Sequence, residues 1–389
     1  MKISNSIHYV GVNDHQIDLF EGLFNVPNGM SYNSYVIFDE KIAVMDSVGE
    51  NFGEEWLDNI ESAVGNRTPD YLIVQHMEMD HSANIQKFIS KYPNAKIVAS
   101  KMAFGMLNSL FGDSLGKISE KQIVVSDGES LELGEHILHF VSAPNVHWPE
   151  VIFTYESSEK ILFSADAFGK FGALDYEDPE GWACEARRYY FGIVGKFGTS
   201  VQAVLKKLEG LQIEKICSLH GPVLDSDIES YLQKYQIWSS YAVESEGVFI
   251  AYTSVYGNTK KAVEKLAEIL KEKGCAKVVV ADLAREDIYE CVEDAFRYGK
   301  LVLATTTYNA GVFPTMREFI EHLVARNYQK RKIAFVENGT WAPTANKAME
   351  RLFENSQEIT FVKSKVSIKV AMTAANVEQM HALADELLA

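Results

Sequence analysis

The chain has 389 residues, with 37 basic and 54 acidic side chains and a formal net charge of −17 at pH 7. This negative charge argues against nucleic acid or an anionic membrane surface as a partner, because both would repel it. Hydrophobic residues make up 47% of the chain and aromatic residues 11%, so the chain can form two or three packed domains.

The first 246 residues are rich in short apolar segments bounded by polar ones. Strands are predicted at 34–38, 41–46, 71–74, 97–99, 123–125, 136–141, 151–155, 160–165 and 215–219. Helices are predicted at 54–63, 84–90, 201–211 and 225–240. Several of these strands end at a His or an Asp, as in an αββα sandwich that carries metal ligands on the loops at one sheet edge.

The pattern changes after a short polar break at 244–247, and we place a domain boundary between residues 246 and 247. Strands are predicted at 248–252, 278–281, 301–304, 333–336 and 366–370. Helices follow them at 259–273, 287–298, 315–325, 345–353 and 377–388. Five strand-then-helix units predict a doubly wound parallel sheet in a domain at 247–389.

The cysteines are few and scattered, at Cys184, Cys217, Cys275 and Cys291. They form no CxxC pair, which excludes a rubredoxin-type site of four thiolates within this chain and fits a reducing compartment. The first residues lack the apolar core of a signal peptide, and no uncharged run predicts a membrane span. We therefore expect a cytoplasmic protein.

Potential metal ligands are concentrated in the hexapeptide His76-Met77-Glu78-Met79-Asp80-His81, directly after a predicted buried strand. Further candidates lie at the ends of later strands, at His147, Asp166 and His220. The seven side chains predict a two-metal site. Four imidazoles and three carboxylates suit iron or manganese better than an all-His shell does, although spacing alone leaves zinc open. The other histidines are interpreted as packed or solvated: His8, His15, His136, His139, His322 and His381.

Three polar loops follow neighbouring strands of the second domain. The candidate binding residues in the first loop, which opens a helix, are Ser254, Val255, Tyr256, Gly257, Asn258 and Thr259. Those in the second are Thr307, Tyr308, Asn309, Ala310 and Gly311, and those in the third are Asn338, Gly339, Thr340 and Trp341. A helix N-terminus favours a phosphate, and such loops meet at the switch point of a doubly wound sheet. Tyr308 and Trp341 could flank a flat ring, and the alternative is that they pack in the core.

The order His-x-Glu-x-Asp-His, then a distant His, Asp and His, resembles the metallo-β-lactamase-like superfamily. Glu78, where hydrolases usually carry His, makes the chain similar to the flavodiiron proteins (A-type flavoproteins). The resemblance covers essentially the whole chain and implies an α+β sandwich of αββα type followed by a flavodoxin-like α/β sheet. It also implies FMN, with its phosphate in the first loop and its isoalloxazine between the other two. The third loop departs from the Tyr-Gly-Trp ending of many members.

The resemblance further implies a role for each metal ligand: His76, Glu78 and His147 on one iron, Asp80, His81 and His220 on the other, and Asp166 between them. The implied activity is reduction of O2 to water or of NO to N2O, in a head-to-tail homodimer or a dimer of such dimers. Because no four-cysteine module exists in the chain, electrons are expected from a separate rubredoxin-like or reductase partner.

A tyrosine in the segment at 187–190 is a candidate catalytic residue, and two rival functions fit the same sequence. In Arg187-Arg188-Tyr189-Tyr190, the resemblance places a tyrosine hydroxyl near the metal pocket, and Tyr190 is our candidate catalytic residue. The alternative for this segment is a helix start with its charges in solvent. The rival functions are a dizinc hydrolase with an accessory flavodoxin-like domain, and a non-catalytic electron carrier or sensor.

Overall fold

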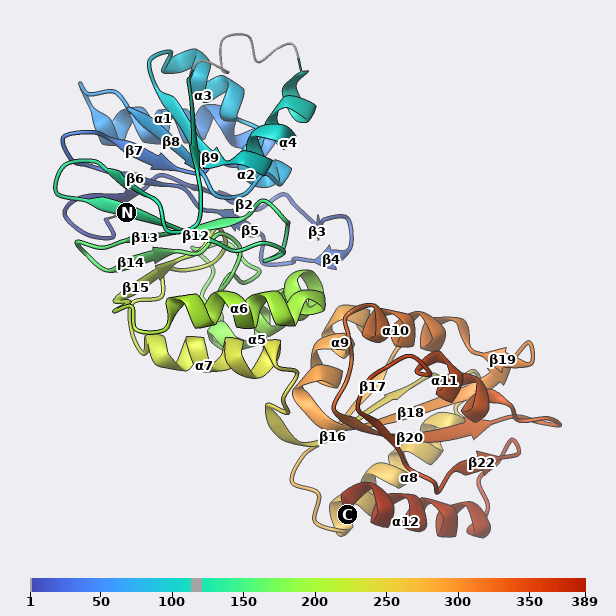
Figure 1. The fold of residues 1–389 in the computed structure, drawn as a ribbon. Coiled ribbons are helices and arrows are strands. Elements are labelled where there is room, and N and C mark those ends of the chain that lie inside the picture. The colour runs from blue at the N-terminus through green and yellow to red at the C-terminus, as the bar shows by residue number, and fades with distance from the viewer. Residues whose placement is uncertain (1, 113–120) are drawn as a thin grey trace. The chain divides into compact units, whose positions relative to one another are not determined.

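The computed structural model describes residues 2–112 and 121–389 (Figure 1). The chain forms two compact units, Met1–Gln236 and Ile237–Ala389. The domain boundary that we place between residues 246 and 247 stays a prediction. In the structure that position falls within strand β16 (Ser245–Tyr252).

The first unit contains two facing sheets. One has the strand order β1 (Ile7–Tyr9), β6 (Tyr35–Ile37), β7 (Ala43–Met45), β8 (Tyr71–Val74), β9 (Lys96–Ser100), β10 (Gln122–Val125). The other has the order β11 (Ser130–Glu132), β12 (Ile137–Ser142), β13 (Ile152–Glu156), β14 (Ile161–Phe163), β15 (Lys215–Cys217). Two small hairpins pair β2 (Val12–Asp14) with β5 (Met30–Tyr32) and β3 (Leu19–Phe20) with β4 (Phe24–Asn25).

Helices cover the outer faces of these two sheets, which gives the expected αββα sandwich (Figure 1). On the first sheet lie α1 (Gly53–Val64), α3 (Ile85–Lys91) and α4 (Lys101–Phe111), and on the second lie α5 (Trp182–Tyr189), α6 (Gly198–Leu208) and α7 (Ile228–Ser239). Helices α4 and α5 are not among the elements that the sequence predicts.

The core between the two sheets explains why the strands read as continuous apolar runs. On β8, Tyr71 and Ile73 join Phe140 and Phe163 of the other sheet in one buried cluster. All four residues of β8 are buried, because helices cover the opposite face of the sheet. Strands β7 and β8 are parallel, as are β14 and β15. The segments after β8, β14 and β15 carry six of the seven metal-ligand candidates, and His147 lies between β12 and β13.

The second unit is a parallel sheet with the order β17 (Val278–Asp282), β16, β18 (Tyr298–Tyr308), β20 (Arg331–Asn338), followed by β21 (Ile359–Phe361) and β22 (Val366–Ile368), which both pair with β20. This is the 2-1-3-4-5 order of flavodoxin-like sheets, and the predicted fold class is confirmed. Helices α8 (Asn258–Glu272) and α12 (Ala374–Leu388) pack on one face. On the other lie α9 (Ile288–Arg297), α10 (Pro314–Ala325) and α11 (Ala345–Leu352) (Figure 1).

Strand β18 is longer than predicted, because the polar residues after Ala304 continue the pairing with β20 as far as Thr306. The strand then turns back through Asn309 and Ala310, which have φ angles of 48° and 58°, into the short strand β19 (Gly311–Val312). The second predicted loop is therefore the tip of a tight hairpin.

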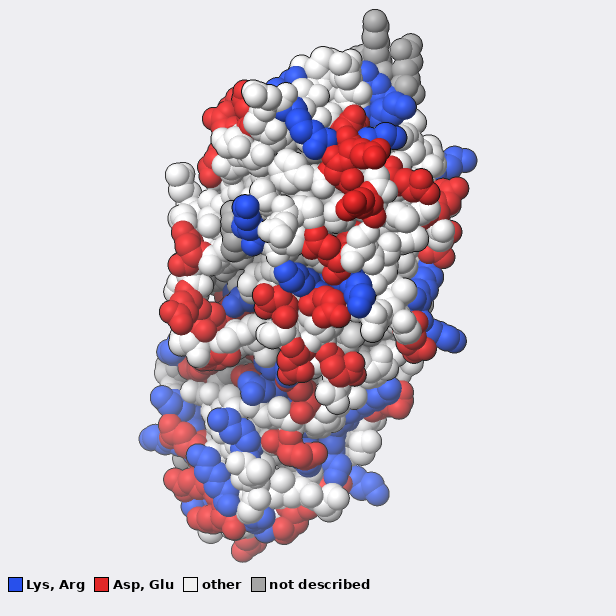
Figure 2. All heavy atoms as spheres, turned by 90° about the vertical axis from the view of Figure 1, so that its left-hand side faces the viewer, with Lys and Arg blue, Asp and Glu red and all other residues white. Residues whose placement is uncertain are grey.

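Charge is divided unequally between the two units. Residues 1–236 contain 18 basic and 34 acidic side chains, whereas residues 237–389 contain 19 and 20. Nearly all of the excess negative charge therefore belongs to the first unit. Figure 2 shows acidic and basic side chains interspersed on one face of the molecule. Within residues 2–112 and 121–389, no helix is both long and apolar enough to span a bilayer.

Candidate metal centre and nucleotide cavity

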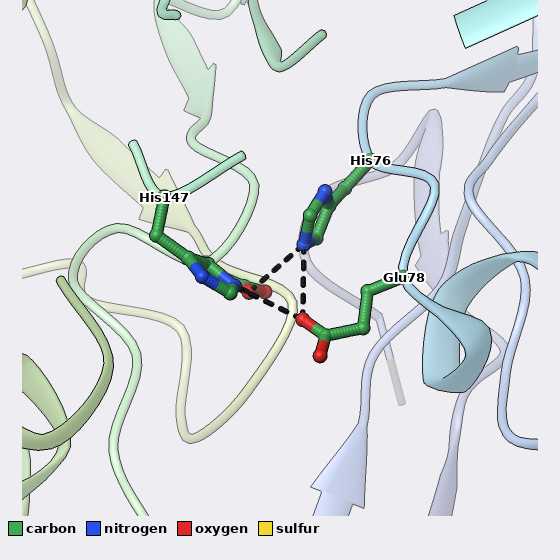
Figure 3. A group of neighbouring side chains, drawn as sticks. His76, Glu78 and His147 are labelled. Atoms are coloured by element: carbon green, nitrogen blue, oxygen red, sulfur yellow. Dashed lines mark hydrogen bonds and ion pairs between the residues drawn. The ribbon is translucent and has the colours of Figure 1, made fainter. Parts of the chain in front are cut away.

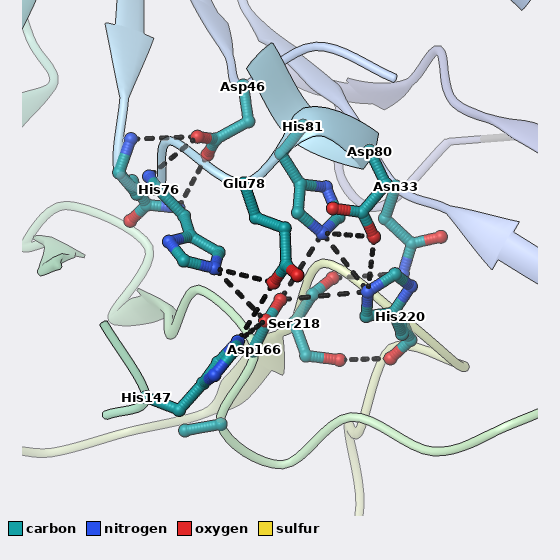
Figure 4. Close-up of polar contacts among 12 residues, drawn as sticks. Asn33, Asp46, His76, Glu78, Asp80, His81, His147, Asp166, Ser218 and His220 are labelled. Atoms are coloured by element: carbon teal, nitrogen blue, oxygen red, sulfur yellow. Dashed lines mark hydrogen bonds and ion pairs between the residues drawn. The ribbon is translucent and has the colours of Figure 1, made fainter. Parts of the chain in front are cut away.

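The structure brings all seven predicted metal ligands together (Figure 4). They form two groups, His76, Glu78, His147 and Asp166, and Asp80, His81 and His220, and the ligand-capable atoms of each group lie within 4.8 Å of one another. Figure 3 shows how His76, Glu78 and His147 converge from two loops: the Nε2 atoms of the histidines lie 3.2 and 3.0 Å from Glu78 Oε2. In the second group, Asp80 Oδ2 lies 3.1 Å from His81 Nε2 and 3.3 Å from His220 Nε2.

Asp166 lies between the two groups and faces both. Its Oδ2 atom is 3.1 Å from His147 Nε2 and 3.4 Å from His76 Nε2. Its Oδ1 atom is 3.3 Å from His81 Nε2. One carboxylate therefore presents one oxygen to each group, which is the geometry of a bridging ligand.

The loop after β8 is shaped by two buried carboxylates that accept backbone N–H groups. Asp46, at the end of β7, accepts from Gln75 N at 2.7 Å and from His76 N at 3.3 Å. Glu150 accepts from Met77 N at 2.9 Å. Because these N–H groups are held by side chains, the chain leaves the sheet at once and directs His76 and Glu78 to the same point.

The loops after β14 and β15 are also fixed by buried hydrogen bonds to the backbone. Ala165, just before Asp166, has a φ of 47°, and its carbonyl accepts a hydrogen bond from Leu219 N at 2.8 Å. The Asn33 amide donates to the carbonyl groups of Ser218 and Gly221 at 2.9 and 2.7 Å, on both sides of His220. A positive φ at a non-glycine residue costs about 1–2 kcal/mol, and here this cost accompanies the placement of a candidate ligand.

The electrostatics of the metal-free site fit a pair of cations. Burial alone would lower the pKa of His81, but Asp80 and Asp166 outweigh it and raise this pKa to about 10. The pKa of His147 is raised to about 9 in the same way, against the effect of burial, by Asp166 and Glu78. Within the described residues, Asp80 Oδ1 is buried without a hydrogen-bond partner, while Asp80 Oδ2 and Asp166 Oδ1 lie 3.1–3.7 Å from histidine Nε2 atoms. The site therefore requires positive charge, and its nitrogen and oxygen donors suit iron.

Three residues near the metal site were not predicted from the sequence. Glu21 lies in the turn between β3 and β4, and its pKa is raised to about 7, first by burial and then by the Glu78 carboxylate. The Tyr189 ring lies 5.5 Å from that of His220. Glu150 contacts His76 directly. Glu150 follows His147 by three positions and Tyr189 belongs to the segment at 187–190, but no spacing indicates that Glu150 contacts His76 or that Glu21 approaches Glu78.

The segment at 187–190 differs from the sequence alternative. It is the end of α5 and not a helix start, and Arg187 and Arg188 are buried, not in solvent. Arg188 donates to Glu185 and to the Asn25 carbonyl at 2.8 and 2.9 Å, so its charge is compensated inside the protein. The ring of Tyr190 is buried and contacts Phe191 and Tyr235. A catalytic role for Tyr190 stays a prediction.

In the second unit the three predicted loops surround a cavity of about 440 Å³. The predicted residues that line it are Ser254, Val255, Tyr256, Asn258, Thr259, Thr307, Tyr308, Asn309, Ala310, Asn338, Gly339, Thr340 and Trp341. The other two predicted residues, Gly257 and Gly311, belong to the same loops without lining the cavity. A fourth loop after β22 contributes Val370, which we did not predict.

The first loop is built to receive an anion. Gly257, with a φ of 87°, precedes α8, and Ser254 Oγ accepts the N–H groups of Gly257 and Lys260 at 3.1 and 3.2 Å. Ser254 Oγ thus occupies the position that an anion takes at a helix N-terminus, and the hydroxyl groups of Thr259 and Thr306 lie near the same helix start, 3.3 Å from each other.

The aromatic residues at the cavity are exposed. Trp341 is 87% exposed, Tyr256 is 92% exposed and Tyr308 is 47% exposed. The alternative that Tyr308 and Trp341 pack in the core is therefore wrong. Rings that stand free at a cavity edge can stack on a flat ligand, and the residues present fit a flavin mononucleotide.

A metallo-β-lactamase-like sandwich with a two-metal site, joined to a flavodoxin-like sheet with a nucleotide cavity, defines the class of this protein. Two family models agree with it: "ODP family beta lactamase" matches residues 30–221 and "Flavodoxin domain" matches residues 249–371. The chain is 30% identical to the uncharacterized protein MJ0732 of Methanocaldococcus jannaschii, over 91% of this chain and 89% of that one. It is 29% identical to a nitric oxide reductase of Moorella thermoacetica, over 90% of this chain and 88% of that one.

Two further similarities complete the comparison. The chain is 33% identical to putative diflavin flavoprotein A 2 of Synechocystis over 84% of its own length, but it spans only 56% of that longer protein. The crystal structure of the flavodiiron protein from Giardia intestinalis matches 99% of this chain and 95% of its own, with a TM-score of 0.92 and 25% identity. The chain belongs to the flavodiiron proteins, which are also called A-type flavoproteins.

The raised histidine pKa values predict that the difference in stability between the metal-free and metal-loaded proteins depends on pH. The folded pKa values of His81 and His147, about 10 and about 9, lie above the ordinary 6.5. Protonation therefore stabilises the metal-free fold fully below pH 6.5, and this stabilisation is lost as the pH rises through 9 and 10. Metal-bound imidazoles need no proton. The stability gained on loading with redox-inert Zn²⁺ should thus increase from pH 7 to pH 9, as measured by urea unfolding. A gain that stays constant or shrinks would contradict this assignment.

Proposed function

We propose that this protein is a flavodiiron oxidoreductase that reduces O2 to water, NO to N2O, or both. The observation that carries the proposal is the Asp166 carboxylate, which presents one oxygen to each of two His–carboxylate groups. The full-length similarity to a protein named nitric oxide reductase supports NO as a substrate. Reduction of O2 to water takes up four electrons and four protons, and reduction of two NO molecules takes up two of each and releases one water.

We propose that the seven ligands divide between two irons. His76, Glu78 and His147 hold one iron, while Asp80, His81 and His220 hold the other, and Asp166 bridges them. Bound at these sites, FMN supplies electrons and the two irons supply open positions for diatomic substrates. The protein fixes the spacing through Asp166 and excludes water by burying the histidines.

Tyr189 is a proposed hydrogen-bond donor in this pocket, beside our candidate Tyr190. Its hydroxyl group is buried and has no hydrogen-bond partner in the part of the chain that the structure describes. Burial, followed by the charges of Asp166 and Asp80, raises its pKa well above 10, so the hydroxyl keeps its proton at neutral pH. A protonated hydroxyl can donate to an oxygen atom that carries negative charge.

We further propose that two copies associate head to tail, so that the flavin of one copy faces the metals of the other. Exposed basic side chains lie next to the residues that form the flavin cavity: Lys260, Arg317 and Lys369. The metal-binding unit carries the excess negative charge, and exposed Leu23 and Met79 lie close in sequence to Glu21 and Glu78. Charge complementarity and apolar rims on both surfaces support this contact.

The electron donor is proposed to be a separate protein of rubredoxin or reductase type. The four cysteines are scattered in sequence, with no CxxC pair, so they do not form a rubredoxin-type site. We also propose a cytoplasmic location, which the small number of scattered cysteines supports.

Glu78 distinguishes this proposal from both rival functions. Glu78→Ala removes one oxygen ligand, and turnover of O2 and NO should fall by more than the 10- to 100-fold typical of losing an outer partner. FMN content should stay unchanged, because the flavin cavity lies in the other unit. Glu54→Ala, which removes an exposed carboxylate of α1, is the matched control. Turnover that survives in Glu78→Ala would contradict the diiron function, and thioester or phosphodiester hydrolysis by a two-zinc form would favour the hydrolase.

Trp341 should stack on the bound flavin. An aromatic contact of this kind is worth about 0.5–1.5 kcal/mol, so Trp341→Ala should weaken FMN binding by up to about tenfold. The measurement is the FMN dissociation constant, determined by flavin fluorescence, with Trp182→Phe in the metal-binding unit as the control. Equal affinity in Trp341→Ala and the unchanged protein would exclude the stacking role.

The head-to-tail arrangement predicts complementation between two inactive variants. Glu78→Ala disables the metals, and Ser254→Glu should repel the FMN phosphate by placing a carboxylate in its loop. Mixed dimers contain one intact flavin facing one intact metal pair, so mixing the variants under conditions of subunit exchange should restore activity. Activity that does not return, although mixed dimers form, would show that electrons pass within one chain.

A further inference from the structure

A buried carboxylate, Glu150, stands behind one of the seven proposed ligands. Its Oε1 atom lies 2.8 Å from His76 Nδ1, and both side chains are fully buried. An ionised carboxylate can only accept, so His76 Nδ1–H donates to Glu150. The free Nε2 atom then faces Glu78 and Asp166, at 3.2 and 3.4 Å.

The second group of ligands lacks such a negative partner among the described residues. His220 Nδ1 donates to the backbone carbonyl of Ser31 at 2.7 Å. His81 Nδ1 is buried and has no hydrogen-bond partner within the same residues. The rings of Phe20 and Tyr32 lie 5.4 and 5.9 Å from that of His220. The first group therefore has a carboxylate hydrogen-bonded to a ligand Nδ1 atom, whereas among the described residues no Nδ1 atom of the second group has one, and the buried Asp46 carboxylate acts on His81 through its charge alone.

We propose that Glu150 is a positioning residue that makes the two metal positions unequal. The ion held by His76, Glu78 and His147 binds more tightly and reaches the ferric state first. A hydrogen bond from Nδ1 to a carboxylate makes the imidazole a stronger electron donor, and a buried negative charge favours the more positive ion. The proposal rests on the proposed function only in requiring two metals.

The charge of Glu150 can be separated from its place in the loop. Glu150 also accepts from Met77 N, so removing the side chain would disturb the backbone as well. Glu150→Gln keeps an acceptor oxygen of the same reach for both N–H groups, removes the charge, and replaces Oε2, which has no partner among the described residues, with an amide NH2. A matched control is Glu156→Gln, because Glu156 is a buried carboxylate that lies 3.0 Å from His136 Nδ1, outside the metal site.

The test begins with the unchanged protein loaded with one equivalent of Fe²⁺ per chain under anaerobic conditions. Anomalous diffraction should show iron first at the His76, Glu78 and His147 position. Equal occupancy, or preference for the Asp80, His81 and His220 position, would overturn the proposal without any variant. Failure to bind iron at all would instead refute the proposed function.

The Glu150→Gln variant then tests whether the difference in iron affinity between the two metal positions comes from the charge of Glu150. Iron affinity at the His76 position should fall by about 10- to 100-fold in chelator competition, while the other position keeps its affinity. The electron paramagnetic resonance signal of the mixed-valent pair should weaken during reductive titration, because the two ions become more alike. Glu156→Gln should change neither measurement. Wild-type affinity at both positions in Glu150→Gln would overturn the role of Glu150.

Discussion

The Asp166 carboxylate, shared between two groups of histidines and carboxylates, is the contact on which the metal site depends. Its two oxygens lie 3.1 and 3.3 Å from His147 and His81, which belong to different loops. Such a concentration of buried charge is unfavourable in a metal-free protein, and this explains why the histidine pKa values are raised. Two bound cations would resolve the imbalance.

The sandwich fold creates this site by placing strand ends at one edge. The apolar runs of β8 and β14 are buried on both faces, which fixes their registers and leaves their loops free to carry polar residues. Asp46, Asn33 and Glu150 then hold those loops by accepting or donating backbone hydrogen bonds. In the other unit, the same principle places three loops around a cavity at the carboxyl edge of a parallel sheet.

The sequence predicted the ligands and the flavin loops because both are local signals. The hexapeptide at 76–81 and the turns after strands β16, β18 and β20 can be recognised without knowing the tertiary structure. Residues that act through long-range contacts could not be predicted in this way. Glu150 lies 74 positions from His76, and Glu21 approaches Glu78 only because a hairpin folds over the site. The alternative for the segment at 187–190, a helix start with its charges in solvent, is wrong because the partners of the buried Arg188, Glu185 and Asn25, cannot be recognised from periodicity.

The central claim is that this chain holds two irons and one flavin, and the most direct test is their quantification in protein purified without oxygen. Elemental analysis and flavin extraction should give two iron atoms and one FMN per chain. The donor set of four imidazoles and three carboxylates favours that outcome, and the cavity at the edge of the parallel sheet accommodates the flavin. Two zinc atoms in place of iron, or a chain that binds no FMN, would contradict the account.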